Sequence, residues 1–311
     1  MTKKYLYHIN YDIKNSQLVA LEMKSLFKNS VHNNILNSDI NIKPSVSPFI
    51  KERLEIIYTS NSFENIIDII KKNNFKSENF RIEYLRHKDD IHTHAQRLDM
   101  QIKVSYAIDG IGTIKNQDIT FAITNLNNKW FFGEYLKNDY YWRNHNNKPH
   151  SYSNAMSADM SRSIINIATG LNKSIKVIDP CCGIGTVVLE GLDLGIDIYG
   201  NEINIQIASN AIENIKFFKH KNVITTGDMH DIKDHYDVSI LDIPYGLFSD
   251  ITSDQQLEII KTCRRISNKL ILICAIDMQQ QIEDCGFTLK EKIKVAKNSQ
   301  NSFTRTILVC I

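Results

Sequence analysis

Residues 177–186 read Val-Ile-Asp-Pro-Cys-Cys-Gly-Ile-Gly-Thr, and they join a short apolar run to the start of a helical pattern. The apolar run ends at Asp179, so a charged side chain stands at the tip of an expected strand. Gly183 and Gly185 allow the backbone to turn tightly and to approach a ligand where the next helix begins. This stretch therefore predicts a strand, a ligand-binding loop and a helix in succession.

The spacing of the glycines narrows the kind of ligand. A dinucleotide-binding loop needs a further glycine three positions after the second one, and Val188 occupies that position. An acidic residue at the strand tip also suits a positively charged or hydroxyl-rich ligand better than a pyrophosphate. Both features argue against a nicotinamide dehydrogenase.

The second half of the chain repeats the alternation of strand and helix. Strand patterns lie at 174–180, 196–200, 222–226, 237–242 and 269–276, and helical patterns at 186–195, 204–218 and 254–266. Nearly continuous, β-branched apolar strands of this kind are typical of a parallel sheet covered by helices on both faces. Two last strand patterns, 287–295 and 303–311, flank a polar turn. We predict an α/β fold, a doubly wound Rossmann-like sheet with an antiparallel C-terminal hairpin.

The first half predicts a smaller α+β module. Strand patterns lie at 5–11, 53–59, 80–85, 119–124 and 130–136, and helical patterns at 17–27, 63–73 and 94–108. Residues 137–150 are polar and aromatic and end near a proline, which is typical of a linker. We therefore predict two domains, at 1–147 and 148–311.

Charge and composition restrict the class of protein. The net charge is +2, with a basic excess in residues 1–150 and an acidic excess after them, which favours a polyanionic partner for the first half. The sequence contains no apolar run of the length of a signal peptide or a membrane span, and we expect a cytoplasmic protein. The six cysteines lack paired C-x-x-C spacing, so neither a zinc site nor a disulfide framework is expected.

Two more strand patterns end in polar residues. Glu202 follows the second strand about twenty residues after the glycines, where a doubly wound fold places a carboxylate for the hydroxyls of a ribose. Asp228 and Met229 follow the third strand, and they could accept from an adenine amine and lie against its ring. Taken singly, each could equally be a solvated loop residue or a packing residue.

The fourth strand ends in Asp242-Ile-Pro-Tyr-Gly246. Asp242 and the carbonyls around Pro244 can accept hydrogen bonds from an exocyclic amine, and Tyr245 offers a face for stacking. Acceptors on both hydrogens of such an amine direct its lone pair toward an electrophile, so catalysis is by positioning and electrostatics. A buried strand followed by a turn is the alternative for this motif taken alone.

These motifs together resemble those of a known family. DPCCGIGT at 179–186 resembles the D-P-x-C-G-x-G-T cofactor loop of class I S-adenosylmethionine-dependent methyltransferases that methylate amino groups, and DIPYG resembles their [D/N]-P-P-[Y/F] signature. Ile243 stands where the first proline of that signature is expected. Residues 148–168 are similar to the tRNA guanine-N2-methyltransferases of the guanine-10 type, which carry an N-terminal THUMP-containing region. The segments YLYHIN, LEMKSLF, PFIKERLEIIYTS and NNKWFFGEYLKN also fit that family.

The resemblance implies the fold and the site. The first domain would be a degenerate THUMP-like domain, and the second a Rossmann-like methyltransferase domain that binds S-adenosyl-L-methionine and no metal. The implied cofactor-binding residues are Tyr152, Ser153, Asp179, Pro180, Cys181, Gly183, Gly185, Thr186, Glu202, Ile203, Asp228 and Met229. The implied catalytic residues are Asp242, Pro244 and Tyr245, which would hold the target amine.

The function that follows is methyl transfer from S-adenosylmethionine to the N2 amine of a guanine, in RNA and most readily in tRNA. A DNA adenine-N6 methyltransferase shares the chemistry of the fourth motif, but the chain has no extended target-recognition region after it. A non-catalytic RNA-binding protein that keeps the fold is the other alternative.

Two further segments carry residues with a possible role. His87, His92 and His94 could mimic the spacing of metal ligands, but solvated surface histidines are the favoured interpretation. The run at 140–143, Tyr-Tyr-Trp-Arg, could stack on RNA bases or pack between domains.

Overall fold

The chain forms two compact units in a computed structural model that describes residues 3–152, 155–243, 251–296 and 304–311. Residues 1–10 and 29–139 make up the first unit, and residues 11–28 and 140–311 make up the second. The boundary near residue 140 lies within the expected linker. The short segment 11–28, which the sequence analysis assigned to the first domain, belongs to the second unit instead.

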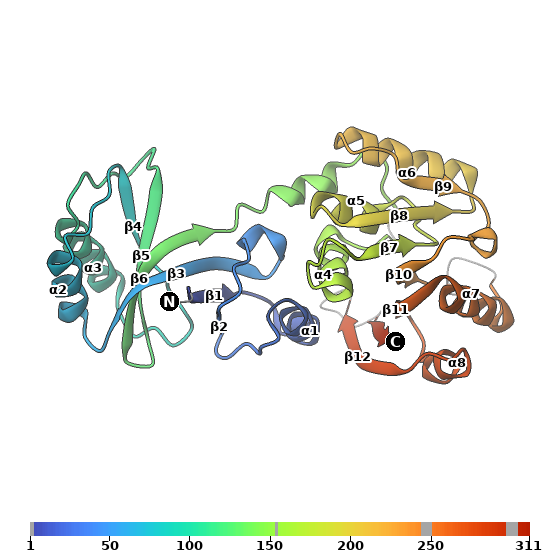
Figure 1. The fold of residues 1–311 in the computed structure, drawn as a ribbon, viewed down its shortest axis with the longest axis horizontal. Helices are drawn as coiled ribbons and strands as arrows, with labels where there is room; N and C mark the ends of the chain where they lie inside the picture. The colour runs from blue at the N-terminus through green and yellow to red at the C-terminus, as the bar shows by residue number, and fades with distance from the viewer. Residues whose placement is uncertain (1–2, 153–154, 244–250, 297–303) are drawn as a thin grey trace. The chain divides into compact units, whose positions relative to one another are not determined.

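The second unit is built on a seven-stranded sheet (Figure 1). Its strands are β7 (Lys176–Asp179), β8 (Asp197–Glu202), β9 (Ile224–Thr226), β10 (Tyr236–Asp242), β11 (Ser267–Cys274), β12 (Leu289–Ala296) and β13 (Thr304–Cys310). They are ordered β12-β13-β11-β10-β7-β8-β9. Strands β7 to β11 run parallel, and β13 is antiparallel to both of its neighbours. The predicted doubly wound sheet with its antiparallel hairpin is confirmed.

Helices cover both faces of this sheet. They are α1 (Ser16–Phe27), α4 (Ala158–Thr169), α5 (Thr186–Asp193), α6 (Ile205–Phe217), α7 (Ser253–Ile266) and α8 (Gln279–Asp284), with 3-10 turns η1 (Ile13–Asn15), η3 (Tyr141–Asn147) and η4 (Met229–Asp231). Leu241, Leu272 and Leu308 join α7 and α8 in one apolar cluster on one face. Helix α4 contacts α1, α5 and β10 on the other face. Because both faces are buried, the strands are apolar at nearly every position.

Helix α1 is tied to α4 by a buried carboxylate. The side chain of Glu22 on α1 is fully buried, and its oxygens accept hydrogen bonds from Ser163 Oγ at 3.0 Å and Asn166 Nδ2 at 2.6 Å. A buried carboxylate is stable only when its oxygens are satisfied, so these two donors on α4 fix the place of α1. Neighbouring position in the sequence therefore did not decide which unit this helix joins.

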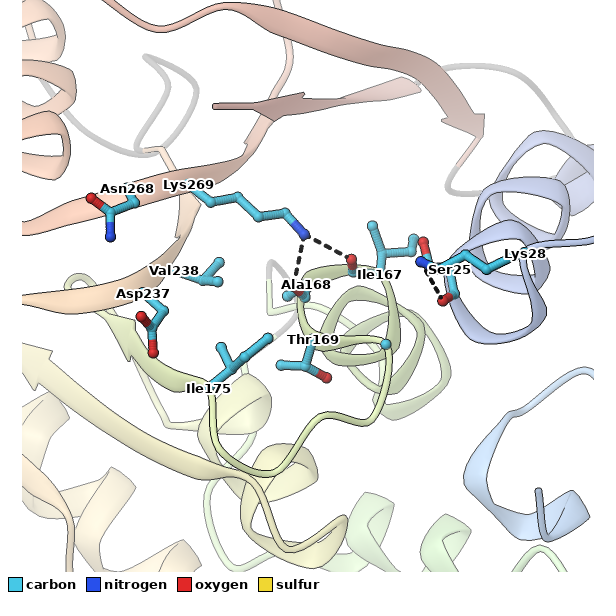
Figure 2. A pocket seen from close by; sticks show the side chains of 11 residues that line it. Ser25, Lys28, Ile167, Ala168, Thr169, Ile175, Asp237, Val238, Asn268 and Lys269 are labelled. Carbon is cyan, nitrogen blue, oxygen red and sulfur yellow. Dashed lines mark hydrogen bonds between the residues drawn. The ribbon is translucent and has the colours of Figure 1, made fainter. Parts of the chain in front are cut away.

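The amino edge of the second sheet holds a pocket of about 400 Å³ beside the end of α4 (Figure 2). Lys269, near the start of β11, donates from Nζ to the carbonyl oxygens of Ile167 at 3.1 Å and Ala168 at 2.7 Å. These carbonyls belong to the last turn of α4, so the lysine satisfies acceptors that the helix cannot pair itself. Burial, and to a lesser degree the charge of Lys28, lowers the pKa of Lys269 to about 8.

The first unit is a six-stranded sheet with two helices. Its elements are β1 (Tyr5–Ile9), β2 (Ile35–Ser38), η2 (Pro44–Val46), β3 (Ile50–Ser60), α2 (Phe63–Lys72), β4 (Phe80–Tyr84), α3 (His94–Ala107), β5 (Ile119–Leu126) and β6 (Lys129–Lys137). The strand order is β2-β1-β3-β6-β5-β4, with only β4 and β5 parallel among these paired strands. Phe80, Phe121 and Phe132 pack with α2 and α3 in one apolar cluster. The predicted α+β module is confirmed, and its THUMP-like character stays a prediction.

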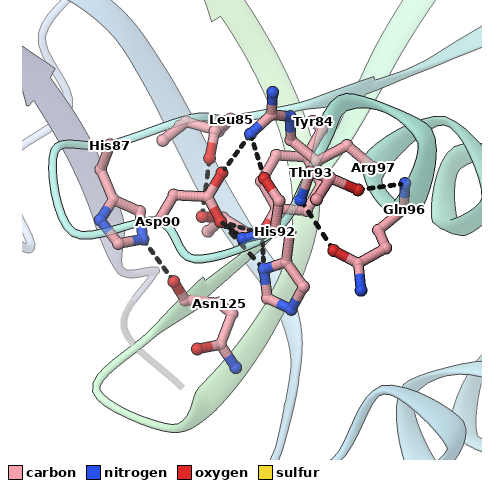
Figure 3. Close-up of polar contacts among 10 residues, drawn as sticks. Tyr84, Leu85, His87, Asp90, His92, Thr93, Gln96, Arg97 and Asn125 are labelled. Atoms are coloured by element: carbon pink, nitrogen blue, oxygen red, sulfur yellow. Dashed lines mark hydrogen bonds and ion pairs between the residues drawn. The ribbon is translucent and has the colours of Figure 1, made fainter.

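The histidine-rich loop between β4 and α3 is ordered around a buried carboxylate (Figure 3). The side chain of Asp90 has no exposed surface, and its oxygens accept from Arg97 Nη1 and His92 Nδ1, both at 2.9 Å. His87 is also buried, and its Nε2 lies 2.5 Å from the carbonyl oxygen of Asn125. The expectation of solvated histidines is wrong for His87, because its side chain is buried and contacts the Asn125 carbonyl. Within the described ranges, no group of three His, Cys, Asp or Glu side chains could hold a metal ion.

Candidate active site

The candidate active site lies at the carboxyl edge of the second sheet. Because β7, β8, β9 and β10 are parallel and adjacent in the sheet, their carboxyl ends meet at one edge. Asp179, Glu202 and Asp242 are the last residues of β7, β8 and β10, and Asp228 follows β9. The four acidic residues that the sequence analysis selected on separate motifs are thereby brought to the same edge.

The loop after β7 is held open by its glycines and fixed by Glu202. Gly183 and Gly185 adopt positive φ angles of 54° and 77°, which favour glycine, and Gly185 is the N-cap of α5. Glu202 accepts from the backbone N–H groups of Gly183 and Asn204, both at 3.0 Å. The carboxylate therefore joins the loops after β7 and β8, and each of its oxygens retains a lone pair for a ligand hydroxyl.

Asn201 is a residue that the sequence analysis missed. It is buried on β8, and its side-chain amide donates to the carbonyl oxygens of Pro180 at 3.3 Å and Gly227 at 2.9 Å. The backbone N–H of Cys182 donates in turn to the Asn201 carbonyl at 2.9 Å. One side chain thus links the loops after β7 and β9. Its position directly before Glu202 is the only sequence signal that could have indicated this role.

Asp179 has an unusual electrostatic environment. It is 5% exposed, and burial raises the pKa of its carboxyl to about 8, with the charges of Asp242 and Glu202 acting in the same direction. A hydrogen bond of 3.4 Å from the Cys181 N–H opposes the rise only in part. Asp179 therefore keeps its proton near pH 7, and it can donate a hydrogen bond where an ionised carboxylate could only accept one.

The cysteines of the same loop are not reactive nucleophiles. Burial raises the pKa of the Cys181 and Cys182 thiols well above the usual range, and the neighbouring acidic residues add to this. The thiolate is the reactive form of cysteine, so burial disfavours nucleophilic chemistry at these two side chains. Cys181 Sγ lies 3.5 Å from Met229 Sδ, and this contact joins the loop to the apolar core.

Asp242 lies beside an arginine of the C-terminal hairpin. Arg305 on β13 is 3% exposed, and one of its guanidinium nitrogens lies 3.8 Å from Asp242 Oδ2. The next residue, Ile243, is buried, and its backbone N–H donates to the Ile273 carbonyl on β11 at 3.0 Å. A proline has no N–H and could not make this bond. Ile243 therefore continues the pairing of β10 with β11, which fixes the backbone where the family signature has a proline.

Three of the other candidates, Tyr152, Ile203 and Thr186, are among the described residues. Tyr152 is 44% exposed, and its hydroxyl oxygen accepts from Asn210 Nδ2 on α6 at 2.7 Å. Ile203 is 67% exposed directly after β8. Thr186 is buried at the first position of α5. Ser153, Pro244 and Tyr245 lie outside the described residues.

The residues after β9 differ from each other in exposure. Asp228 is the N-cap of η4, and its Oδ1 accepts from the His230 N–H at 2.9 Å. Met229 is 5% exposed and belongs to the apolar cluster below the edge. Asp228 thus has a carboxylate oxygen available at the edge, whereas Met229 contributes mainly to the core.

The aromatic segment at 140–143 packs within the second unit. Trp142 is fully buried, and the Tyr141 hydroxyl donates to Asp193 Oδ2 at 2.7 Å. Arg162 on α4 donates to the same carboxylate at 2.9 Å and to Glu190 at 2.7 Å. Such a satisfied network of buried charges fixes η3 against α4 and α5. Packing, not base stacking, is therefore the role of Trp142.

Comparisons with known proteins give distant similarities. No family model matches the chain. The chain is 21% identical over 174 residues to the tRNA (guanine(10)-N2)-dimethyltransferase of Methanothermobacter thermautotrophicus, which covers 52% of this chain and 51% of that protein. It thus spans about half the length of this curated relative.

Two solved structures are among those similar to this chain. TrmN from Thermus thermophilus is similar over 99% of both chains, with 13% identity and a TM-score of 0.48. Magnesium protoporphyrin IX methyltransferase from Synechocystis PCC 6803, solved with bound S-adenosylmethionine, is similar over 51% of this chain and 86% of that one, with 14% identity and a TM-score of 0.40.

The strand order of the second unit identifies its fold. Five parallel strands are followed by a hairpin whose last strand, β13, is inserted between β11 and β12. A glycine loop follows the first parallel strand, and acidic residues end the first, second and fourth. The second unit therefore has the class I S-adenosylmethionine-dependent methyltransferase fold.

Proposed function

We propose that the chain is an RNA methyltransferase that transfers a methyl group from S-adenosylmethionine to the N2 amine of a guanine, with tRNA as the preferred substrate. The observation that carries the proposal is the joint position of Glu202 and Asp242 at one edge of the sheet, one on each side of the glycine loop after β7. The similarity to a curated protein named a tRNA guanine-N2-dimethyltransferase supports the choice of substrate.

The residues at the edge suit the parts of this cofactor. Glu202 has lone pairs for the two ribose hydroxyls, and Asp228 offers an acceptor for the adenine amine. At Gly183 an added Cβ would meet no atom within 4 Å, so the loop leaves open space beside its backbone. When bound, S-adenosylmethionine supplies a methyl group on a positively charged sulfur, which leaves as a neutral thioether once a nucleophile takes the methyl carbon.

Asp242 would act on the acceptor amine. A guanine N2 amine is a weak nucleophile because its lone pair is delocalised into the ring. A carboxylate that accepts one of its hydrogens, together with a backbone carbonyl that accepts the other, holds the nitrogen in line with the methyl carbon. The same carboxylate stabilises the positive charge that develops on the nitrogen, which then loses a proton to water or to Asp242.

The RNA itself would be held mainly by the first domain. In this proposal residues 1–147, apart from the segment 11–28 that joins the second unit, form the RNA-binding region, and residues 148–311 form the methyltransferase domain. Folded RNA is recognised largely by backbone and shape, and an enzyme that modifies a base must take it out of its stack.

A methyl-transfer assay tests the proposal. The purified chain would be incubated with S-adenosylmethionine carrying a tritiated methyl group and with tRNA, rRNA or double-stranded DNA, and the labelled nucleoside would be identified by mass spectrometry. We expect label in N2-methylguanosine from tRNA. Label in N6-methyladenine from DNA would instead support the DNA alternative. Failure of the chain to bind S-adenosylmethionine in calorimetry would support a non-catalytic RNA-binding protein.

A further inference from the structure

Arg305 and Asp242 project from the same face of the second sheet. Asp242 is paired with Ile273 on β11, and Ile273 is paired with Ile307 on β13. Paired residues on neighbouring strands point to the same face, and residues two apart along a strand do so as well. Arg305 lies two residues before Ile307, so its side chain extends across β11 toward Asp242, in agreement with their separation of 3.8 Å.

The insertion of β13 brings this arginine to the carboxyl edge. Because β13 is antiparallel to β11, its first residues lie beside the last residues of β11. Thr306 is paired with Cys274, which ends β11, and Arg305 precedes Thr306. A cation on any later residue of β13 would lie farther down the sheet, away from the acidic edge.

The charges around Asp242 make the position of this cation important. Asp179 on β7 and Glu202 on β8 interact electrostatically at the same edge, and the Cys274 thiol on β11 is also influenced by Asp242. Closely spaced carboxylates cannot all ionise easily, so one of them keeps a proton unless a cation compensates. The guanidinium of Arg305 lies 3.8 Å from Asp242 Oδ2, and a positive charge at that distance favours the ionised form of Asp242.

We propose that Arg305 is a positioning residue that keeps Asp242 ionised and directed at the acceptor amine. The arginine does not touch the reacting atoms in this proposal. It acts through Asp242, and it allows the neighbouring Asp179 to remain a neutral acid without loss of the anionic acceptor. The catalytic part of this inference rests on the proposed methyl transfer to an amine, whereas the ion pair itself does not.

Two substitutions of Arg305 separate charge from volume. Arg305→Lys keeps a cation, and Arg305→Met keeps much of the volume without the charge. We expect R305M to lower kcat for methyl transfer to tRNA by on the order of 100-fold, with the Kd for S-adenosylmethionine essentially unchanged. We expect R305K to recover most of the lost activity. A merely structural role would lower the melting temperature and cofactor binding together and would not distinguish the two variants by charge.

The dependence of kcat on pH provides a second test of the proposal. Without the guanidinium, the pKa of Asp242 rises, so the acidic limb of the kcat profile should move to higher pH in R305M. Arg264→Met is the matched control, because Arg264 is an exposed arginine of α7 that donates to the Gly286 carbonyl at 3.2 Å. The profile of R264M should coincide with that of the unsubstituted protein. An unmoved acidic limb in folded R305M would overturn the proposal.

A spectroscopic titration keeps the test independent of activity. The carboxyl carbon of Asp242 can be followed by NMR in protein labelled with ¹³C-aspartate and assigned by its absence in Asp242→Asn. We expect its midpoint to lie at a higher pH in R305M than in the unsubstituted protein, and near the unsubstituted value in R305K. If R305M does not fold, R305K and the unsubstituted protein are compared instead. The ion pair is overturned if the titration midpoint of Asp242 lies at or above that of free aspartate in both of these proteins. A chain that methylates no nucleic acid would refute the proposed function, whereas the titration would still test the pair.

Discussion

At the carboxyl edge of the second sheet, Asp179 is buried with only a weak hydrogen bond to its carboxylate, and its pKa rises to about 8. At the amino edge, Lys269 is buried against two helix carbonyls, and its pKa falls to about 8. Burial drives both groups toward their neutral forms, because each charged form is poorly solvated there. The comparison teaches that burial shifts an acid and a base at the two edges of this sheet in opposite directions, and each shift favours the neutral form.

The largest expected effect concerns Asp242, the last residue of β10 at the carboxyl edge. Asp242→Asn keeps the shape of the side chain but removes its charge, and kcat for methyl transfer should fall on the order of 1,000-fold. The Kd for S-adenosylmethionine, measured by calorimetry, should stay nearly constant. Asp254→Asn, an exposed aspartate at the start of α7, is the control and should leave both quantities unchanged. Full activity of D242N would refute the assigned role.

The next effect concerns the carboxylate that holds the glycine loop. Glu202→Gln replaces one acceptor oxygen by a donor, so the bond from Gly183 or that from Asn204 is lost. Hydrogen bonds to charged groups contribute about 1.5–3 kcal/mol, and we expect cofactor affinity to fall about ten- to a hundredfold. Glu258→Gln, whose exposed carboxylate contacts Lys261, serves as the control. An unchanged Kd in E202Q would exclude Glu202 from the cofactor site.

A third prediction tests the neutral acid at the same edge. The folded protein holds a proton on Asp179 up to about pH 8, whereas the unfolded chain releases it near its ordinary pKa of 3.8. The contribution of Asp179 to stability is therefore present below pH 3.8 and is lost as the pH rises to about 8. As the pH rises between these limits, the free energy of unfolding should fall more in the unsubstituted protein than in Asp179→Asn. Urea titrations at a series of pH values would measure this. Parallel pH curves for the two proteins would contradict the raised pKa.

The smallest effect is expected for Lys269 at the amino edge, where burial lowers the pKa instead of raising it. The folded pKa of Lys269 is about 8 and the unfolded value is 10.5, so the unfolded chain binds more protons between them. Stability should therefore rise with pH through this window in the unsubstituted protein, relative to Lys269→Met. Lys261→Met, at an exposed lysine of α7, is the control. The lowered pKa would be contradicted if the difference in free energy of unfolding between K269M and the unsubstituted protein did not change with pH.

The sequence was sufficient to predict the parallel strands and their polar tips. Each tip has a local signature in the sequence. Asp179 and Asp242 directly follow apolar runs, and Glu202 ends a strand pattern about twenty residues after the glycine loop. Local signatures are enough when a side chain acts at the end of its own strand. The parallel sheet, whose strands carry these tips to one edge, was predicted from the alternation of strands and helices.

The residues that the sequence did not reveal act across strands. The role of Asn201 depends on the loops after β7 and β9, and that of Arg305 depends on the insertion of β13 beside β11. No periodicity in the sequence states which strands become neighbours of a hairpin. Burial of His87 was missed for a related reason, because its side chain contacts the carbonyl of Asn125, which lies far along the chain.

The docking of α1 on α4 has a consequence for the synthesis of the chain. This helix is synthesised before its partners, which are Ser163 and Asn166 on α4 and the strand β12. Glu22 must remain hydrated until those donors have been made, and the first unit is completed in the meantime. Contacts between such remote parts slow folding, and N-terminal domains generally fold first during synthesis. The second unit is therefore begun before the first unit is complete, and it is closed after it.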